Sequence, residues 1–324
     1  ITMATMTTTT KDLTHLQAFR ALEQSRMMAW QALLAVAAAR QQTAETALSE
    51  APTTVVNGDM LRWQPDTGWC CAEGLDPSTR DFLELYLPFC QRPAEGGTEV
   101  VGHLGQSLDG CIATHTGDSC FVTGQENIRH LHRMRALADA VIVGAGTVVS
   151  DDPRLTTRLV PGPNAVRVVL DTRRRLAADH RVFTDGVATT LLCCAEGLER
   201  EPQGQCEFLE LPAPGGRLDL RALVQALRRR GLRRLFVEGG GVTVSRFLAQ
   251  GLLQRLQIAV APLVIGHGRP GVTLPPRPAL SDALRPLARV YRMGQDMLYD
   301  FDLRADCGGA EPTPSEQEGI ERIC

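Results

Sequence analysis

The sequence has no apolar run long enough to cross a membrane, little net charge and no paired-cysteine metal motif. Its most apolar stretch, residues 27–39, falls short of the roughly 20 residues that a bilayer requires, and no secretory signal is evident. A formal net charge of −3 gives the chain no general attraction to nucleic acid or anionic lipid. We therefore expect a cytoplasmic protein without a membrane or nucleic-acid partner.

The cysteine pattern gives little support to metal or disulfide chemistry. Ten cysteines are spread thinly over 324 residues, and none forms the Cys-x-x-Cys spacing that is typical of zinc sites. Adjacent pairs at Cys70-Cys71 and Cys193-Cys194 are interpreted as reduced thiols. The sequence therefore predicts no metal site.

Composition and periodicity divide the chain into four parts. Residues 1–11 are rich in threonine and begin without methionine, so they are predicted to be disordered or a cloning remnant. Residues 12–92 are predicted to form a small helical appendage that serves in dimerisation or as a lid. After a linker at 93–97 comes the main domain, 99–304, followed by a glycine-, proline- and glutamate-rich tail, 305–324, that is predicted to be disordered.

The appendage shows three structural patterns and no catalytic one. Apolar residues at three- and four-residue steps predict a helix over about 13–48. Turn sequences predict a hairpin that pairs 60–63 with 69–71. Asp76 is expected to cap a further helix, which ends before Pro88.

The main domain alternates strand and helix patterns. Continuous apolar strands separated by amphipathic helices are typical of an α/β fold, in which helices flank a mostly parallel sheet on both faces. The predicted strands are an alternating one at 99–106, continuous ones at 141–143, 166–170, 189–194 and 235–237, one at 256–260, and a terminal hairpin at 288–291 and 297–303; the predicted helices are 125–137 and 220–230.

Two of these strands run into glycine turns. Gly144 and Gly146 follow the strand at 141–143 and lead into a polar loop, and Gly239-Gly240-Gly241 opens a helix after the strand at 235–237. Glycine lets backbone N–H groups approach a phosphate, and a helix N-terminus favours an anion. If the two turns lie side by side, with Thr147 near Gly240, they predict a dinucleotide site.

Seven motifs occur in an order that resembles the reductase domain of bacterial riboflavin biosynthesis, the 5-amino-6-(5-phosphoribosylamino)uracil reductase. The resemblance covers roughly Glu99 to Arg304. It implies a fold similar to dihydrofolate reductase. The motifs are Ser107-Leu-Asp-Gly110, Arg135-Ala-Leu-Ala-Asp-Ala140, Gly144-Ala-Gly-Thr-Val148, Asp151-Asp-Pro-Arg-Leu-Thr-Thr-Arg158, Val168-Val-Leu-Asp171, Val237-Glu-Gly-Gly240 and Ala261-Pro-Leu-Val-Ile-Gly266.

The resemblance also implies an activity and a set of site residues. The expected enzyme is a homodimer that transfers hydride from NADPH to an open-chain ribosylimine of a phosphorylated pyrimidine, which converts ribosyl to ribityl. The expected coenzyme contacts are Gly105, Phe121, Gly144, Gly146, Thr147, Asp151, Thr172, Gly240, Gly241, Val242, Thr243, Val244, Ser245 and Arg246. The expected substrate contacts are Ser119, Arg135, Leu155, Arg158 and Glu238. Beyond what the resemblance implies, we predict that His103, Asp151 and Glu238 are catalytic.

The chemistry of these side chains fits their division into coenzyme contacts and substrate contacts. Arg135 and Arg158 offer guanidinium forks for a sugar phosphate, and Glu238 can accept hydrogen bonds from the N–H edge of a pyrimidine. Arg246 or Thr172 is expected to meet the 2′-phosphate of NADPH. Asp152, which precedes a proline, is interpreted as a turn cap outside the site.

Two departures from the family pattern leave alternatives open. His103 stands where the family commonly has lysine, and we hypothesise that it protonates the imine nitrogen or binds the ribose. The zinc signature of the deaminase half of bifunctional members is absent, so no deamination is predicted. The rival hypotheses are reduction of another pterin or pyrimidine-like substrate, and a non-catalytic nucleotide-binding scaffold.

Overall fold

The computed structural model describes residues 10–42, 60–64, 67–91, 97–120, 122–198 and 202–304, with side chains only for 20–39 in the first of these ranges. The chain divides into two compact units, one of residues 1–97 with 161–163 and one of the remainder. Of the segments predicted to be disordered, 1–11 and 305–324, residues 1–9 and 305–324 lie outside the described residues, and residues 10 and 11 belong to a helix. The predicted coenzyme contact Phe121 also lies outside the described residues.

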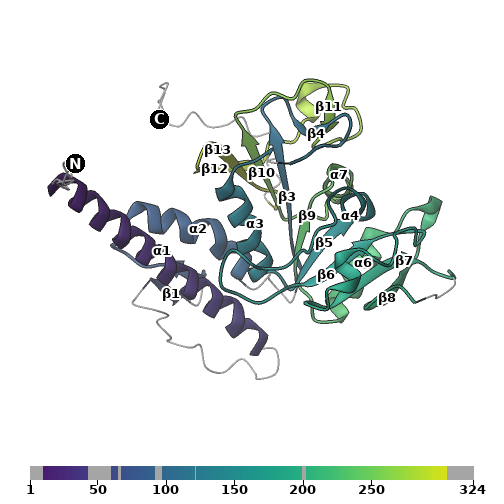
Figure 1. Ribbon diagram of the computed structural model, residues 1–324, viewed down its shortest axis with the longest axis horizontal. Helices are drawn as coiled ribbons and strands as arrows, with labels where there is room; N and C mark the ends of the chain where they lie inside the picture. Colours follow the sequence, from purple (N-terminus) through teal and green to yellow (C-terminus); the bar gives the residue numbers. More distant parts are fainter. Residues whose placement is uncertain are drawn as a thin grey trace, which may run out of the picture. The chain divides into compact units, whose positions relative to one another are not determined.

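The first unit is built from two helices and a short hairpin (Figure 1). Asp76 caps the second helix by accepting a hydrogen bond from the Thr79 N–H at 3.0 Å. The two helices pack through Trp30 and Tyr86, whose ring centroids are 6.0 Å apart. The elements are α1 (Thr10–Gln42), β1 (Leu61–Gln64), β2 (Gly68–Cys71) and α2 (Pro77–Cys90).

The prediction that α2 ends before Pro88 is wrong. The helix contains Pro88 and continues to Cys90. Pro88 lies in the last turn, where its missing N–H costs one backbone hydrogen bond. The side chains of Phe89 and Cys90 are almost fully buried, and this burial outweighs the loss. The predicted end of α1 near residue 48 lies beyond the part of the chain that the structure describes.

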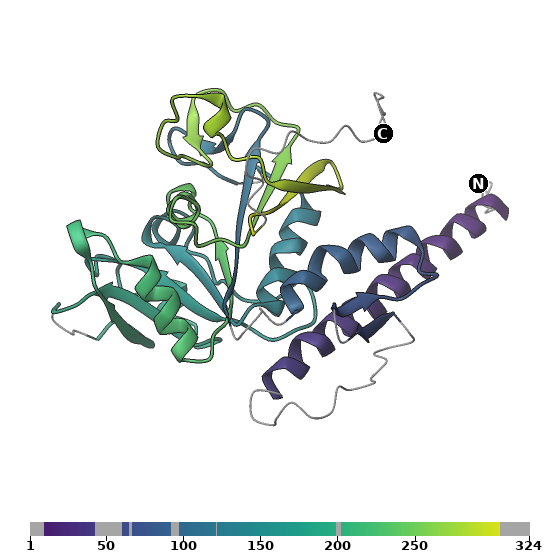
Figure 2. The ribbon, with the colours of Figure 1, turned by 180° about the vertical axis from the view of Figure 1, so that it is seen from behind.

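The second unit is organised around a nine-stranded sheet, counted over the described residues (Figures 1 and 2). From β10 to β8 every neighbouring pair is parallel, and the antiparallel pairs are β12 with β13 and β13 with β10. The predicted mostly parallel α/β fold is confirmed. In spatial order the strands are β12 (Leu287–Met293), β13 (Asp296–Asp302), β10 (Arg255–Ala261), β3 (Glu99–Ser107), β9 (Arg234–Glu238), β5 (Ala140–Gly144), β6 (Val166–Leu170), β7 (Thr190–Ala195) and β8 (Cys206–Leu211).

Helices cover both faces of this sheet. Leu223 and Phe247, from two different helices, share one core with Val100 and Leu235 of the central strands. Phe236 points to the opposite face because side chains alternate along a strand, and there α3 packs against β9. The helices are α3 (Gln125–Leu137), α4 (Ala145–Asp151), α5 (Arg181–Thr184), α6 (Leu220–Arg229) and α7 (Gly241–Ala249), with short 3-10 turns at Pro214–Gly216 and Leu280–Asp282.

Two details differ from the predictions. The strand predicted to alternate, β3, has six consecutive buried residues, because it lies between β10 and β9 with helices on both faces. The segment after Gly144, predicted as a turn and polar loop, forms α4. Its Val148 is fully buried, and this burial outweighs the low helix propensity of the neighbouring residues.

A second, two-stranded sheet lies beyond the carboxyl end of β3. It pairs β4 (Cys111–Thr114) with β11 (Gly268–Pro270) in antiparallel register. Asp109, in the turn before β4, accepts hydrogen bonds from the backbone N–H groups of Ile265 and Gly266 and from the Ser107 hydroxyl. Asp109 therefore ties the β3–β4 turn to the segment that leads into β11.

Among the helices that the structure describes, none combines the length and apolarity needed to span a bilayer.

Candidate active site

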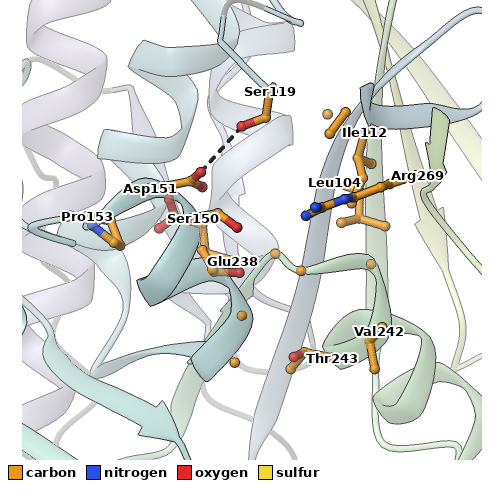
Figure 3. A pocket seen from close by; sticks show the side chains of 18 of the residues that line it. Leu104, Ile112, Ser119, Ser150, Asp151, Pro153, Glu238, Val242, Thr243 and Arg269 are labelled. Atoms are coloured by element: carbon orange, nitrogen blue, oxygen red, sulfur yellow. Dashed lines mark hydrogen bonds between the residues drawn. The ribbon is translucent and has the colours of Figure 1, made fainter. Parts of the chain in front are cut away.

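A cavity of about 1060 Å³ lies at the carboxyl ends of β3, β5 and β9. Parallel strands place their following loops at one edge of the sheet, which is where open α/β sheets bind ligands. The volume is at the top of the range for a single small-molecule pocket. Figure 3 shows Asp151, Ser150 and Pro153 on one wall, Leu104, Ile112 and Arg269 on the other, and Glu238 between them.

The two glycine turns meet at the floor of this cavity. A Cβ atom added to Gly240 would lie 3.1 Å from the Thr147 Oγ1 atom. The predicted proximity of Thr147 to Gly240 is therefore confirmed. Gly240 has φ +65°, which favours glycine, and it precedes α7 without a side-chain cap. The first N–H groups of α7 are left available to an anion.

The shape of the cavity at the start of α7 depends on Gly241. A Cβ on Gly241 would lie 2.8 Å from the Pro270 carbonyl oxygen and closer still to that of Gly271. Only glycine allows the start of α7 to pack this tightly against the end of β11. The close packing keeps Val242, Thr243 and Arg269 on the same cavity.

Arg135 and Glu238 form a buried, bidentate ion pair. The Arg135 Nε donates to Glu238 Oε2 at 2.6 Å, and its Nη2 donates to Oε1. The two side chains are 9% and 11% exposed. Arg135 Nη1 also donates to the Thr156 carbonyl at 3.1 Å. Both residues line the cavity as predicted. The Arg135 fork, predicted to be open to a sugar phosphate, is directed at Glu238.

Asp151 is a second carboxylate on the cavity wall. It accepts a hydrogen bond from the Ser119 hydroxyl at 3.3 Å (Figure 3). Partial burial raises the pKa of Asp151, while the Ser119 hydrogen bond and the Arg269 charge act in the opposite direction. The raised pKa makes Asp151 more easily protonated than an exposed aspartate.

His103 lies at the inner end of the cavity, on β3 beside Glu238 of β9. It is 3% exposed, and its Nε2 hydrogen-bonds the Asn127 Oδ1 at 3.1 Å. Burial lowers the pKa of His103 to about 4. At neutral pH the ring is therefore uncharged, which argues against the hypothesis that it acts as an imidazolium proton donor.

This buried histidine predicts a loss of stability in mild acid. An uncharged His103 contributes stability that is complete above its ordinary pKa of about 6.5 and is lost as pH falls toward about 4. Denaturant unfolding should show the free energy falling over this range, with His130 and His132, whose pKa values burial also lowers, adding to the loss. His103→Gln should remove only the share of His103, up to about 3 kcal/mol. His115→Gln, at an exposed turn, should behave as the wild type; an equal effect from both variants would contradict the assignment.

Arg158 lies next to the main cavity, in an adjoining one of about 340 Å³. Its backbone N–H donates to His132 Nδ1 at 2.9 Å, and its Nη1 donates to the Thr156 Oγ1 at 2.6 Å. Burial and the charges of Arg135 and Arg154 lower the pKa of Arg158. The side chain therefore sits in a field of positive charge, which an anionic ligand would relieve.

The structure brings most of the predicted site residues to these two cavities. Val244 and Ser245 do not line either one, because the helical repeat turns them into the core, where the Ser245 Oγ accepts from the Thr273 N–H at 2.8 Å. Sequence reasoning missed Asn127, Arg181 and Arg269, which carried no motif signal, and assigned no role to Arg154, which lies within the 151–158 motif. The predicted residues that line a cavity are His103, Gly105, Ser119, Arg135, Gly144, Gly146, Thr147, Asp151, Leu155, Arg158, Thr172, Glu238, Gly240, Gly241, Val242, Thr243 and Arg246.

A mostly parallel sheet with a large cavity at the carboxyl ends of its central strands places the protein among the α/β enzymes. Residues 99–299 match the model of the RibD C-terminal domain, and the chain belongs to this family. It is an oxidoreductase of the riboflavin-biosynthesis type.

Relatives and solved structures agree with this assignment. The chain is 35% identical to the 2,5-diamino-6-ribosylamino-4(3H)-pyrimidinone 5′-phosphate reductase of Methanothermobacter thermautotrophicus over 214 residues. The matched region covers 63% of this chain and 98% of that protein. It is 29% identical to the riboflavin biosynthesis protein RibD of Escherichia coli over 62% of this chain and 58% of that protein.

Among solved structures, the deaminase/reductase of Thermotoga maritima matches with a TM-score of 0.54 and 25% identity, over 69% of this chain and 61% of that one. The riboflavin biosynthesis reductase Rib7 of Saccharomyces cerevisiae matches with a TM-score of 0.54 and 21% identity, over 68% and 97%. The predicted fold, similar to dihydrofolate reductase, is confirmed.

Proposed function

We propose that the protein is an NADPH-dependent reductase of a phosphoribosylaminopyrimidine, converting its ribosyl group to ribityl. The observation that carries the proposal is the continuity of the site. Backbone N–H groups at two glycine turns line one part of a single cavity, and the Arg135–Glu238 pair, Asp151 and Ser119 line another. The first set suits a dinucleotide, and the second suits a polar ring and sugar.

The residues present fit a nicotinamide coenzyme. The start of α7 at Gly241 and the turn at Gly144 leave room for a pyrophosphate beside free N–H groups, and Thr147 and Thr243 add hydroxyl donors. When bound, the reduced nicotinamide supplies the hydride that C1′ of the open-chain imine accepts. The protein orients the substrate and delivers a proton to the imine nitrogen.

We assign that proton to Asp151. The cavity wall raises the pKa of Asp151, and the Ser119 hydroxyl holds the carboxyl group in place. Glu238 accepts hydrogen bonds from the pyrimidine edge while Arg135 holds its carboxylate in place. His103, uncharged and bound to Asn127, supports the end of β3 and takes no proton-transfer role in this scheme.

The direct test supplies two candidate substrates to the purified protein with NADPH under anaerobic conditions. These are 2,5-diamino-6-ribosylamino-4(3H)-pyrimidinone 5′-phosphate and 5-amino-6-(5-phosphoribosylamino)uracil. We expect NADPH oxidation with one of them or both, and a product two hydrogens heavier by mass spectrometry. Oxidation of NADPH with neither substrate would refute the proposal.

Family resemblance also leads us to propose a cytoplasmic homodimer. Sedimentation of the purified chain at micromolar concentration should give a two-chain particle. A single-chain particle that retains full activity would contradict the dimer without affecting the proposed reaction.

A preference for NADPH over NADH is assigned to Arg246. This side chain lines the cavity and donates from Nη2 to the Leu218 carbonyl at 2.7 Å. Burial and the neighbouring Arg217 lower the pKa of Arg246, so a phosphate dianion beside the two cations is favoured. Arg246→Ala should raise KM for NADPH about 10-fold and change KM for NADH little. Arg246→Lys should lie between, and Arg228→Ala, on the exposed end of α6, should match the wild type; equal losses with both coenzymes would contradict the assignment.

A further inference from the structure

The smaller cavity is rich in guanidinium groups. Arg135, Arg154, Arg158 and Arg181 line it together with Asp151 and Asp152. Arg135 is already paired with Glu238. Among the residues that the structure describes, neither Arg154 nor Arg158 forms an ion pair with a carboxylate. The cavity therefore holds positive charge that the protein itself does not neutralise.

The Asp152 carboxylate binds Arg181 at the start of α5. Its Oδ1 accepts from the Arg181 N–H at 2.9 Å, and its Oδ2 pairs with the Arg181 Nε at 3.1 Å. His180 Nδ1 lies 3.3 Å from the same Oδ1. Asp152 has φ 38°, a left-handed conformation that is uncommon for a residue other than glycine. The backbone at the end of α4 is thus bent in a way that turns Asp152 toward α5.

The ion pair between Asp152 and Arg181 adds little to stability beyond the hydrogen bond to the Arg181 N–H. The Arg181 side chain is 57% exposed and that of Asp152 38%, and ion pairs this exposed contribute little to folding. The pairing uses Arg181 Nε and leaves the two terminal nitrogen atoms for another acceptor. The same contact fixes the direction of the guanidinium, which lines the cavity together with Arg158.

We propose that Arg181, oriented by Asp152, binds the phosphate of the substrate jointly with Arg158 and so selects phosphorylated over unphosphorylated ribosyl compounds. The inference rests on the proposed function and deepens it. A phosphate dianion is best held by two guanidinium groups that donate to different oxygens. Arg158, on the loop after α4, supplies one, and Arg181, at the start of α5, supplies the other. Asp152 is a positioning residue in this scheme.

The test measures binding of ribose 5-phosphate, with ribose as the unphosphorylated control, by titration calorimetry. Arg181→Ala should weaken ribose 5-phosphate binding about 10-fold, and Arg181→Lys should weaken it less. Asp152→Asn should weaken it about 3-fold. Its effect should vanish in the Arg181→Ala background, because Asp152 acts through Arg181. Arg229→Ala, an exposed arginine on α6, should bind as the wild type.

Kinetics with the phosphorylated substrate separate this inference from the proposed function. Arg181→Ala should raise KM about 10-fold with kcat nearly unchanged. If the wild type reduces neither candidate substrate, the proposed function fails, while the ribose 5-phosphate titrations still decide the role of Arg181. Wild-type affinity in Arg181→Ala, failure of the wild type to bind ribose 5-phosphate, or an undiminished Asp152→Asn effect without Arg181 would each overturn the inference.

Discussion

Replacing Glu238 with glutamine should lower kcat/KM by about 100-fold or more and reduce the free energy of unfolding by about 3 kcal/mol. The two losses share one cause. Glutamine cannot neutralise Arg135, which is 8% exposed and has no other carboxylate partner among the described residues. An unpaired guanidinium remains buried, and the site loses the acceptor proposed for the pyrimidine edge. Steady-state kinetics and denaturant unfolding measure the two effects separately.

The double variant Arg135→Gln with Glu238→Gln distinguishes catalysis from stability. Removing both charges leaves no uncompensated ion, so most of the unfolding free energy should return. Activity should stay low, because neither a carboxylate nor its guanidinium partner faces the substrate. Recovery of activity along with stability would show that the ion pair serves the fold alone.

The sequence predicted the framework of the site better than its charges. Continuous apolar runs identified β5, β6 and β9, because strands buried on both faces admit few polar residues. The glycine turns after β5 and β9 were placed together correctly, because these strands are neighbours and parallel. Buried strands and the glycine turns that follow them can be predicted because they depend on local sequence patterns.

Which side chains pair with each other depends on residues far apart in the sequence, so these pairs could not be predicted from local patterns. Arg135 and Glu238 lie 103 positions apart, and each was predicted to face the substrate by itself. Arg181 and Arg269 come from a four-residue helix and a three-residue strand, which carry too little periodicity to be predicted. Asp152 was interpreted as a turn cap, and its bond to the start of α5 appears only once α4 and α5 are in place.

Replacing Gly241 with alanine should weaken NADPH binding by about 100-fold and lower Tm. The added Cβ would meet the carbonyl oxygens of Pro270 and Gly271. Backbone atoms cannot rotate away, so the start of α7 must separate from β11. The separation would move the free N–H groups of the helix away from the position proposed for the coenzyme pyrophosphate. Fluorescence titration with NADPH and thermal unfolding of the free protein check the two effects.

Gly146→Ala provides a matched variant on the neighbouring turn. A Cβ there has no protein atom within 4 Å among the described residues, and alanine favours the helical backbone of α4. We expect Tm to be unchanged or higher, so any loss of NADPH affinity reports the approach of the coenzyme itself. A loss of about 10-fold with Tm retained would place the coenzyme against the Gly144–Gly146 turn. Wild-type NADPH affinity in both Gly241→Ala and Gly146→Ala would refute a coenzyme site between the two turns, because a bound pyrophosphate would then contact neither of them.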